Sequence, residues 1–350
     1  MSIPAPFTRS RALATALVLS LALAACGGDA EETEPDTGTT DAVEDDAGET
    51  STTGEAGTTQ DDAGEDNDAG ETVEPGGFPV TVDADNGEVT IEARPERIIS
   101  LSPSTTELLF AIGAGDQVIA VDEFSTFPEN APITDLSGWD PNVEAIVGYE
   151  PDLVLMSADA NDLVAALGSL GIPVLVSDAP TVVDGVYDEI ALLGQATGQV
   201  DGATGAAAGM QAGMDHALAA APQDQDVRIY HELDDTFFTL SSNSFIGSVY
   251  ADMGATNIAD AADTDGTGYP QLTEEAIIAA DPEVIIIPDG TSYTAEDVAA
   301  RPGWAEVSAV KNGHIVVVDG DIASRWGTRL PQLVQVLAEA LSAAAVPAGR

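Results

Sequence analysis

The sequence predicts an α/β protein with two lobes, each built on a central, mainly parallel sheet, joined by one long backbone helix. Short apolar runs alternate with helical segments over residues 98–176 and again over residues 227–318, which is typical of βαβ units. A stretch without proline, residues 182–221, separates the two regions. Similar twelve-residue motifs, EAIVGYEPDLVL at 144–155 and EAIIAADPEVII at 275–286, indicate that the lobes are equivalent.

The first lobe is expected to span residues 78–180 and to open with a β-hairpin. Apolar and polar residues alternate on both sides of Asp85-Asn86-Gly87, a sequence that favours a tight turn. The elements expected after the hairpin are strands at 98–101, 118–121, 153–156 and 174–176 and helices at 104–113, 142–148 and 161–168.

A single linking helix is expected over residues 181–222, bounded by Pro180 and Pro222. Its seven glycines weaken this expectation, because each costs about 1 kcal/mol relative to alanine in a helix. The second lobe, residues 223–320, is expected to contain strands at 227–231, 236–240, 284–287 and 315–318 and helices at 244–253 and 274–280. Residues 321–350 then carry a closing helix, 330–345, that packs back on the lobes.

Residues 1–25 are expected to form a signal peptide. Arg9 and Arg11 precede an uncharged stretch of 14 residues, which is too short for a membrane span. Cys26, the only cysteine, follows Leu-Ala-Ala in a pattern that resembles the bacterial lipobox, so acylation and membrane anchoring are predicted. The alternative is a free thiol. In both cases a lone cysteine excludes a disulfide scaffold.

Residues 26–77 are expected to be a disordered tether between the membrane and the lobes. They contain 18 acidic residues, no lysine or arginine, and few large apolar side chains. Residues 78–350 contain 43 acidic and 8 basic residues, so nucleic acid and anionic lipid surfaces would repel them. A role in nucleic-acid binding is therefore excluded.

Enzyme signatures are largely absent from the sequence. It contains no phosphate-binding loop, no nucleophile elbow and no zinc-protease motif. His216, His231 and His314 lie in different predicted elements, where surface or hydrogen-bonded histidines are favoured over a metal site. A lipid-anchored hydrolase with Glu144 and Glu275 as paired carboxylates is the alternative from another class; it requires the two groups to lie about 5–10 Å apart. A cell-surface sensor without a small ligand is a third interpretation.

A resemblance to a known family rests on several motifs in order. The segment PERIISLSPSTTELLFAIG at 95–113 is similar to the opening of the iron-siderophore and cobalamin periplasmic binding proteins. In this family a long helix joins the two lobes. The likeness continues through Phe127-Pro128, Trp139, Glu144 and residues 151–154, then through YPQLTEE at 269–275 and the final strand and helix. The chain resembles the cobalamin-binding branch most.

The resemblance implies two Rossmann-like lobes on a rigid helix, with a ligand held in the cleft. It also implies that Glu144 and Glu275 dock on arginines of a membrane permease. Both glutamates begin predicted helices, where a negative charge also stabilises the helix dipole by about 0.3–1 kcal/mol, and the two interpretations are compatible.

Ligand contacts are expected on loops that follow strands. Ser102, Ser104 and Thr105 offer hydroxyls and helix amides there, although helix capping explains part of this pattern. By resemblance, Phe127, Trp139 and Tyr269 fall where aromatic residues of the pocket stack on the ligand; burial in a lobe core is the alternative. Other ligand-binding candidates are Phe245, Arg325, Trp326 and Arg329.

Arg325 and Arg329 stand out because basic residues are scarce. They would bind anionic groups of a ligand, or else form internal ion pairs. The sequence thus predicts an extracytoplasmic, lipid-anchored, monomeric solute-binding protein of an ABC importer, not an enzyme. Its ligand would be a bulky metal chelate, a corrinoid first and a ferric siderophore or haem next, delivered to a permease with a cytoplasmic ATPase. Because the ligand itself carries cobalt or iron, no metal site or cofactor of the protein is predicted.

Overall fold

The computed structural model describes residues 77–222 and 226–345. The predicted signal peptide, Cys26 and nearly all of the acidic tether lie outside the described residues. Within the described ranges, no helix is both long enough and apolar enough to cross a membrane.

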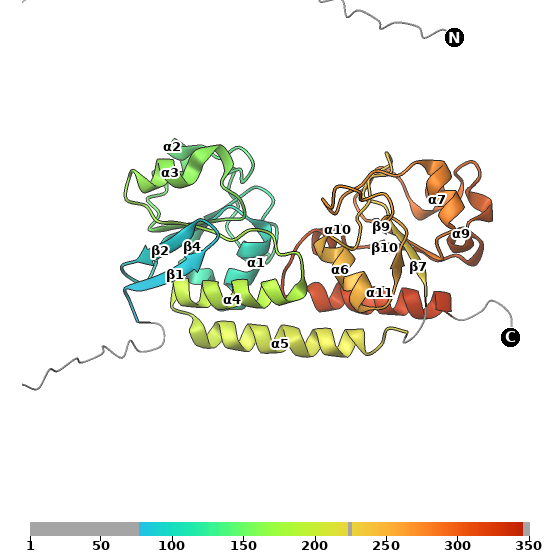
Figure 1. Ribbon diagram of the computed structural model, residues 1–350. Coiled ribbons are helices and arrows are strands. Elements are labelled where there is room, and N and C mark those ends of the chain that lie inside the picture. Colours follow the sequence, from blue (N-terminus) through green and yellow to red (C-terminus); the bar gives the residue numbers. More distant parts are fainter. Residues whose placement is uncertain (1–76, 223–225, 346–350) are drawn as a thin grey trace, which may run out of the picture. The chain divides into compact units, whose positions relative to one another are not determined.

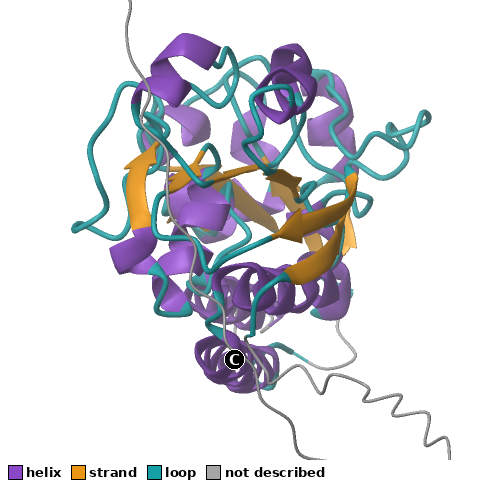
Figure 2. Ribbon diagram, turned by 90° about the vertical axis from the view of Figure 1, so that its left-hand side faces the viewer, coloured by secondary structure: helices purple, strands orange, loops and turns teal. Residues whose placement is uncertain are grey.

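The first lobe is a parallel four-stranded sheet with helices on both faces (Figure 2). Apolar side chains of its strands alternate between two clusters, one packed against α1 and α4 and the other against α2 and α3. The sheet has the order β4-β3-β5-β6. Its elements are β3 (Ile98–Ser100), α1 (Pro103–Ala111), β4 (Val118–Val121), α2 (Val143–Gly148), β5 (Leu153–Met156), α3 (Leu163–Gly168), β6 (Val174–Val176) and α4 (Val183–Thr197).

The predicted hairpin is confirmed as β1 (Val80–Ala84) paired antiparallel with β2 (Gly87–Ile91). Its turn docks on the edge strand β6. The side chain of Asn86 donates to Val174 O and accepts from Val176 N, and the backbone N–H of Asp85 donates to Val176 O. The turn residues therefore attach the hairpin to the first lobe.

The second lobe repeats this architecture. Its parallel sheet has the order β10-β9-β7-β8, so in both lobes the first strand along the chain lies between the second and the third, with the fourth at the edge. This shared order confirms the equivalence that the repeat predicted. Its elements are β7 (Arg228–His231), α6 (Phe245–Asp252), β8 (Thr256–Asn257), α7 (Glu274–Ala280), β9 (Val284–Pro288), α8 (Ala295–Ala299), α9 (Ser308–Asn312), β10 (Ile315–Val318), α10 (Gly320–Ala323) and α11 (Leu330–Ala345).

The expectation of one linking helix over 181–222 is wrong. The segment forms two helices, α4 and α5 (Val200–Leu218), separated at Gly198, which caps α4 with a φ of +71°. The chain reverses there, and α4 packs against α5 (Figure 1). Gly194 permits this packing, because a Cβ at that position would lie 2.4 Å from the Cβ of Ala203. It is α5 that packs against both α4 of the first lobe and α11 of the second.

The strand expected at 236–240 is also not formed. Phe237 adopts a positive φ of 67°, which interrupts an extended conformation, and only isolated bridges link Glu232 with Thr239 and Phe238 with Gln271. The short elements β8, α8, α9 and α10 were not predicted. One hydrophobic cluster runs through α4, α5 and α11 and includes strands of both sheets, so the lobes share a continuous core.

Candidate functional site

Two adjoining pockets lie at the carboxyl ends of the strands, where open α/β sheets place their ligands. The first has a volume of about 500 Å³ and is walled by loops of the first lobe and by residues 321–326. The second has a volume of about 300 Å³ and is walled by residues 179–181, loops of the second lobe and residues 323–326. Ser324 and Trp326 line both pockets, so together the pockets form one cleft between the lobes.

The hydroxyl candidates at the start of α1 lie in different places. Ser102 lines the first pocket and caps the helix, since its Oγ accepts from the backbone N–H of Thr105 at 3.4 Å. Ser104 also lines this pocket, and its Oγ accepts from the backbone N–H of Trp326 at 3.2 Å. Thr105 is buried outside both pocket linings, and its hydroxyl donates to Glu189.

Large aromatic faces are exposed on both lobes. Trp139 is 84% exposed and lines the first pocket, as does Phe124, which is 52% exposed; Tyr269, 54% exposed, lines the second. Gly138 lets the Trp139 loop approach the sheet, because a Cβ there would lie 2.5 Å from the carbonyl oxygen of Leu101. Exposed aromatic faces of this kind suit a large flat ligand.

The second pocket has a more buried wall. Phe245, the first residue of α6, is almost fully buried and lines this pocket. It starts its helix at Ser244, whose Oγ accepts from the backbone N–H of Gly247 at 3.1 Å. A side chain at position 247 would strike the carbonyl of Ser241, so the loop before α6 packs tightly onto the helix. The candidate Phe245 thus forms part of a rigid pocket wall.

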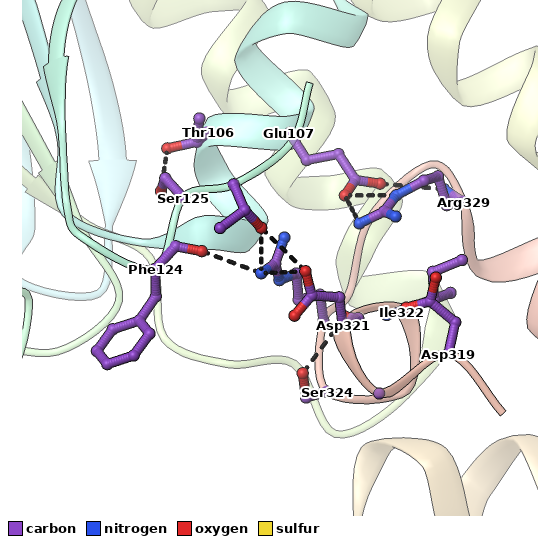
Figure 3. Close-up of polar contacts among 12 residues, drawn as sticks. Thr106, Glu107, Phe124, Ser125, Asp319, Asp321, Ile322, Ser324 and Arg329 are labelled. Atoms are coloured by element: carbon purple, nitrogen blue, oxygen red, sulfur yellow. Dashed lines mark hydrogen bonds and ion pairs between the residues drawn. The ribbon is translucent and has the colours of Figure 1, made fainter. Parts of the chain in front are cut away.

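Arg325 reaches across the lobes at the edge of the first pocket. Its Nη2 donates to the carbonyl oxygen of Phe124 at 3.0 Å and to Thr126 Oγ1 at 3.0 Å, and it pairs with Asp321 at 3.0 Å. Figure 3 shows Asp321 and Ser324 beside the loop that carries Phe124. Arg325 is 7% exposed, and its Nη1 is buried without a hydrogen-bond partner.

Arg329 and Phe127 do not line either pocket. The Arg329 guanidinium binds Glu107 through Nε at 3.0 Å and Nη2 at 2.8 Å, and it lies 4.0 Å from the centre of the Phe127 ring. Figure 3 shows Arg329 and Glu107 at the junction of the lobes. Of the two alternatives for Arg329, a contact with the ligand or an internal ion pair, the structure shows the internal ion pair. We assign Phe127 and Arg329 to packing between the first lobe and the segment before α11, and Thr105 to packing between α1 and α4 within the first lobe.

Several residues that line the first pocket were missed from the sequence. Asp321 and Ser324 belong to the unpredicted helix α10 and its end, and Asp122 follows β4. Asp122 is buried and accepts a hydrogen bond from Ser125; burial raises its pKa above the ordinary value, although the hydrogen bonds lower it. The signal that could have identified these residues was their position after β4 and β10.

Glu144 and Glu275 occupy equivalent, exposed positions. Each lies in the first turn of its helix, α2 or α7, immediately before the third strand of its sheet. Both helices pack on the sheet faces away from the shared core. Because α2 and α7 belong to different lobes and lie far apart in Figure 1, this arrangement argues against a hydrolase with paired carboxylates.

The histidines also lie apart. His231 is buried, its Nδ1 is 2.8 Å from the hydroxyl of Tyr250, and burial lowers its pKa to about 4. His314 lies near the carbonyl oxygen of Glu283, and His216 is exposed on α5. Within residues 77–222 and 226–345, no group of three or more histidine, cysteine or acidic side chains is placed to hold a metal ion.

Two similar α/β lobes on a shared helical layer, with a cleft at the carboxyl ends of both sheets, define a two-lobed binding protein. The model of the family described as periplasmic binding protein matches residues 98–322, and the chain belongs to this family. Members of the family are solute-binding proteins rather than enzymes.

Relatives support the transport class. An uncharacterized ABC transporter substrate-binding lipoprotein of Bacillus subtilis is 35% identical, over 75% of this chain and 86% of its own length. A cobalamin-binding protein of Halobacterium salinarum is also 35% identical, over 75% and 74%. The coarse class predicted from the sequence, an extracytoplasmic solute-binding protein, is therefore confirmed.

Solved structures share the fold. The vitamin B12 binding protein BtuF of Vibrio cholerae has a TM-score of 0.61 and 26% identity, over 72% of this chain and 98% of its own. The heme-binding protein RhuT of a Roseiflexus species has a TM-score of 0.63 and 25% identity, over 71% and 99%. The predicted fold class, two lobes with mainly parallel sheets, is confirmed.

Proposed function

We propose that this chain captures a bulky metal chelate for an ABC importer, with cobalamin or another corrinoid as the first candidate. The observation that carries the proposal is the cleft itself, in which exposed Trp139 and Phe124 of the first lobe and Tyr269 of the second border adjoining pockets of about 500 and 300 Å³. Cavities in this range accommodate large ligands, and aromatic faces bind flat ones.

Polar side chains also line the cleft, and those of the segment between the lobes are Asp321, Ser324 and Arg325. Arg325, Asp321 and Ser324 line the first pocket, and Arg325 is paired with Asp321 at 3.0 Å. Together they provide donors and acceptors for the amide and phosphate groups of a corrinoid. The relative named as a cobalamin-binding protein supports the same choice.

A ferric siderophore is the second candidate, and haem is the third. Arg325 would serve the anionic oxygens of a siderophore equally well. The structural similarity to a heme-binding protein keeps haem among the candidates. Among the described residues, neither pocket lining contains a histidine that would bind haem iron.

The remaining assignments concern delivery of the ligand. We propose that Cys26 is acylated and holds the protein at the outer face of the cell membrane, with residues 27–77 as a tether. The exposed Glu144 and Glu275, one per lobe, would contact basic residues of the permease while the cleft holds the ligand. A monomer suffices for this role, because each lobe supplies one docking helix.

The proposal is tested by titrating the full chain with cyanocobalamin, a ferric siderophore and haem, and following tryptophan fluorescence with inner-filter correction. We expect saturable quenching by cyanocobalamin at micromolar concentration or below. Trp139→Ala removes an exposed aromatic face and should weaken binding about 30-fold, the loss of about 2 kcal/mol that is typical of a central aromatic contact.

Leu170→Ala is the matched control, because Leu170 is another exposed apolar side chain of the first lobe but lies outside both pocket linings. This variant should bind like the wild type. Quenching by a ferric chelate alone would change the ligand and leave the importer class intact. Equal affinities of the Trp139→Ala variant and the wild type would remove Trp139 from the site.

A further inference from the structure

Trp326 forms the wall between the two pockets, and the first lobe holds it there. The residue lines both pockets, although it belongs to the segment before α11. Its backbone N–H donates to Ser104 on α1 at 3.2 Å, and its indole Nε1–H donates to Glu189 on α4 at 2.6 Å. Glu189 therefore accepts the hydrogen bond from the only donor of the indole ring.

Glu189 is a buried carboxyl group, 3% exposed, that accepts from two hydrogen-bond donors. One oxygen accepts from Trp326, and the other accepts from the hydroxyl of Thr105 at 2.9 Å. Among the described residues, no lysine, arginine or histidine forms an ion pair with it. A buried charge without a counter-ion is costly, so a carboxyl group at this place beside the cleft is an unusual feature of the fold.

The surroundings of Glu189 supply little that would stabilise its charge. Burial raises its pKa to about 7, against the lowering effect of the hydrogen bonds from Thr105 and Trp326, and the charge of Asp85 in the β1–β2 turn raises it further. On α1, Glu107 is paired with Arg329. The charged side chains of β1, α5 and α6, the other elements packed against α4, are exposed.

We propose that Glu189 is a positioning residue of the binding site, which fixes the Trp326 indole between the two pockets through its hydrogen bond to Nε1–H. The inference rests on the proposed function, because the position of the Trp326 indole matters for binding only if the cleft holds a ligand. Ligand affinity then depends on a side chain that does not itself touch the ligand.

The two protonation states of Glu189 hold Trp326 with different strength. The ionised carboxylate accepts from both donors, and the bond to the indole is charge-assisted. After protonation, the carbonyl oxygen still accepts from the indole, while the new hydroxyl donates to Thr105 Oγ1, which as a hydroxyl also accepts. Protonation thus weakens the bond to Trp326 without breaking it. The Glu189→Gln variant would reproduce the neutral state, with the amide oxygen toward Trp326 and the amide nitrogen toward Thr105.

The first test needs no ligand. The chain contains three tryptophans, so selective ¹⁵N labelling of the full chain gives three indole N–H signals, and Trp326→Phe identifies that of Trp326. Between pH 5.5 and 8.5, this signal should move with a midpoint near 7. In Glu189→Gln it should stay, at every pH, close to the position that the wild type shows in acid.

Glu274→Gln is the matched control, because Glu274 accepts from the indole of Trp304 at 2.8 Å in the second lobe. This variant should leave the titration of the Trp326 signal intact. A Trp326 signal that does not move with pH in the wild type would overturn the inference even if no variant folds. So would a shift that persists in Glu189→Gln.

The second test connects the wall to the ligand. The affinity of the wild type for cyanocobalamin should fall about fivefold from pH 8.5 to pH 5.5, as expected when a charge-assisted hydrogen bond becomes a neutral one. Glu189→Gln should show no such change. Equal affinities of the wild type at both pH values would contradict the role in binding. If cyanocobalamin does not bind at all, the proposed ligand is wrong, and the indole titration alone decides on Glu189.

Discussion

Two buried glutamates near the cleft differ in the partner that each has. Glu107 binds the guanidinium of Arg329 across the lobes, whereas Glu189 accepts only from a hydroxyl and an indole. The first charge is compensated and the second is not. The same substitution at these two positions should therefore change stability in opposite directions.

At pH 8, Glu107→Gln should lower the free energy of unfolding by about 3 kcal/mol, because it leaves the charge of Arg329 largely buried without a partner. Glu189→Gln should raise this free energy by up to about 3 kcal/mol, because it removes an uncompensated charge. The pKa of Glu189 rises from 4.5 to about 7 on folding, so its contribution is favourable below pH 4.5 and is lost as the pH rises through 7.

The measurement is urea unfolding of both variants and the wild type at pH 8 and pH 4.5. The increase in the free energy of unfolding caused by Glu189→Gln should shrink toward zero at pH 4.5, where the wild-type carboxyl group is neutral in the folded state. A loss of stability from Glu189→Gln at pH 8 would show that the ionised carboxylate stabilises the fold.

Residue types on loops after strands identified Ser102 and Ser104 as residues near the cleft, and the family resemblance identified Trp139 and Tyr269. These signals were not enough to separate Arg325 from Arg329. The two arginines are four residues apart, and nothing in the sequence around them distinguishes their roles. Only Arg325 lines a pocket, whereas Arg329 is paired with Glu107. The difference arises from Glu107, which is 222 residues away from Arg329 in the sequence.

The helices α2 and α7 occupy equivalent places in the two lobes and carry the repeated sequence motif. Each has an exposed glutamate in its first turn, and each packs on the side of its sheet away from the shared helical layer. A role in permease docking and a role in helix stability both fit this placement. The two roles differ in their effect on transport.

The double variant Glu144→Ala, Glu275→Ala should lose at least tenfold in uptake of cobalamin through the permease, while its affinity for the ligand stays that of the wild type. Glu296→Ala is the matched control, because Glu296 is also exposed in the first turn of a helix, α8, but has no counterpart in the first lobe. Unchanged uptake by the double variant would contradict a role in permease docking and leave helix stabilisation as the role of both glutamates.

Most strands and the longer helices could be predicted, because apolar runs and proline or glycine boundaries mark them. The closing helix 330–345 and the helix 274–280 have the predicted bounds. The break between α4 and α5 could not be predicted from the absence of proline. It depends on Gly198 in a positive φ and on the close contact at Gly194, which are features of tertiary packing.

At the scale of the whole molecule, the lobes share one core through α4, α5 and α11, and bonds from the segment of residues 325–329 join them. The cleft is therefore built from both lobes, and its walls are fixed by contacts that cross between them. This arrangement suits a site that is largely formed before a bulky ligand arrives.

The most direct test of this account is equilibrium dialysis of the full chain against cyanocobalamin, with bound ligand measured by its absorbance or its cobalt. We expect one cyanocobalamin per chain with a Kd in the micromolar range or below, displaced neither by free cobalt nor by a ferric siderophore in equal amount. Equal concentrations of cyanocobalamin on both sides of the membrane would contradict it.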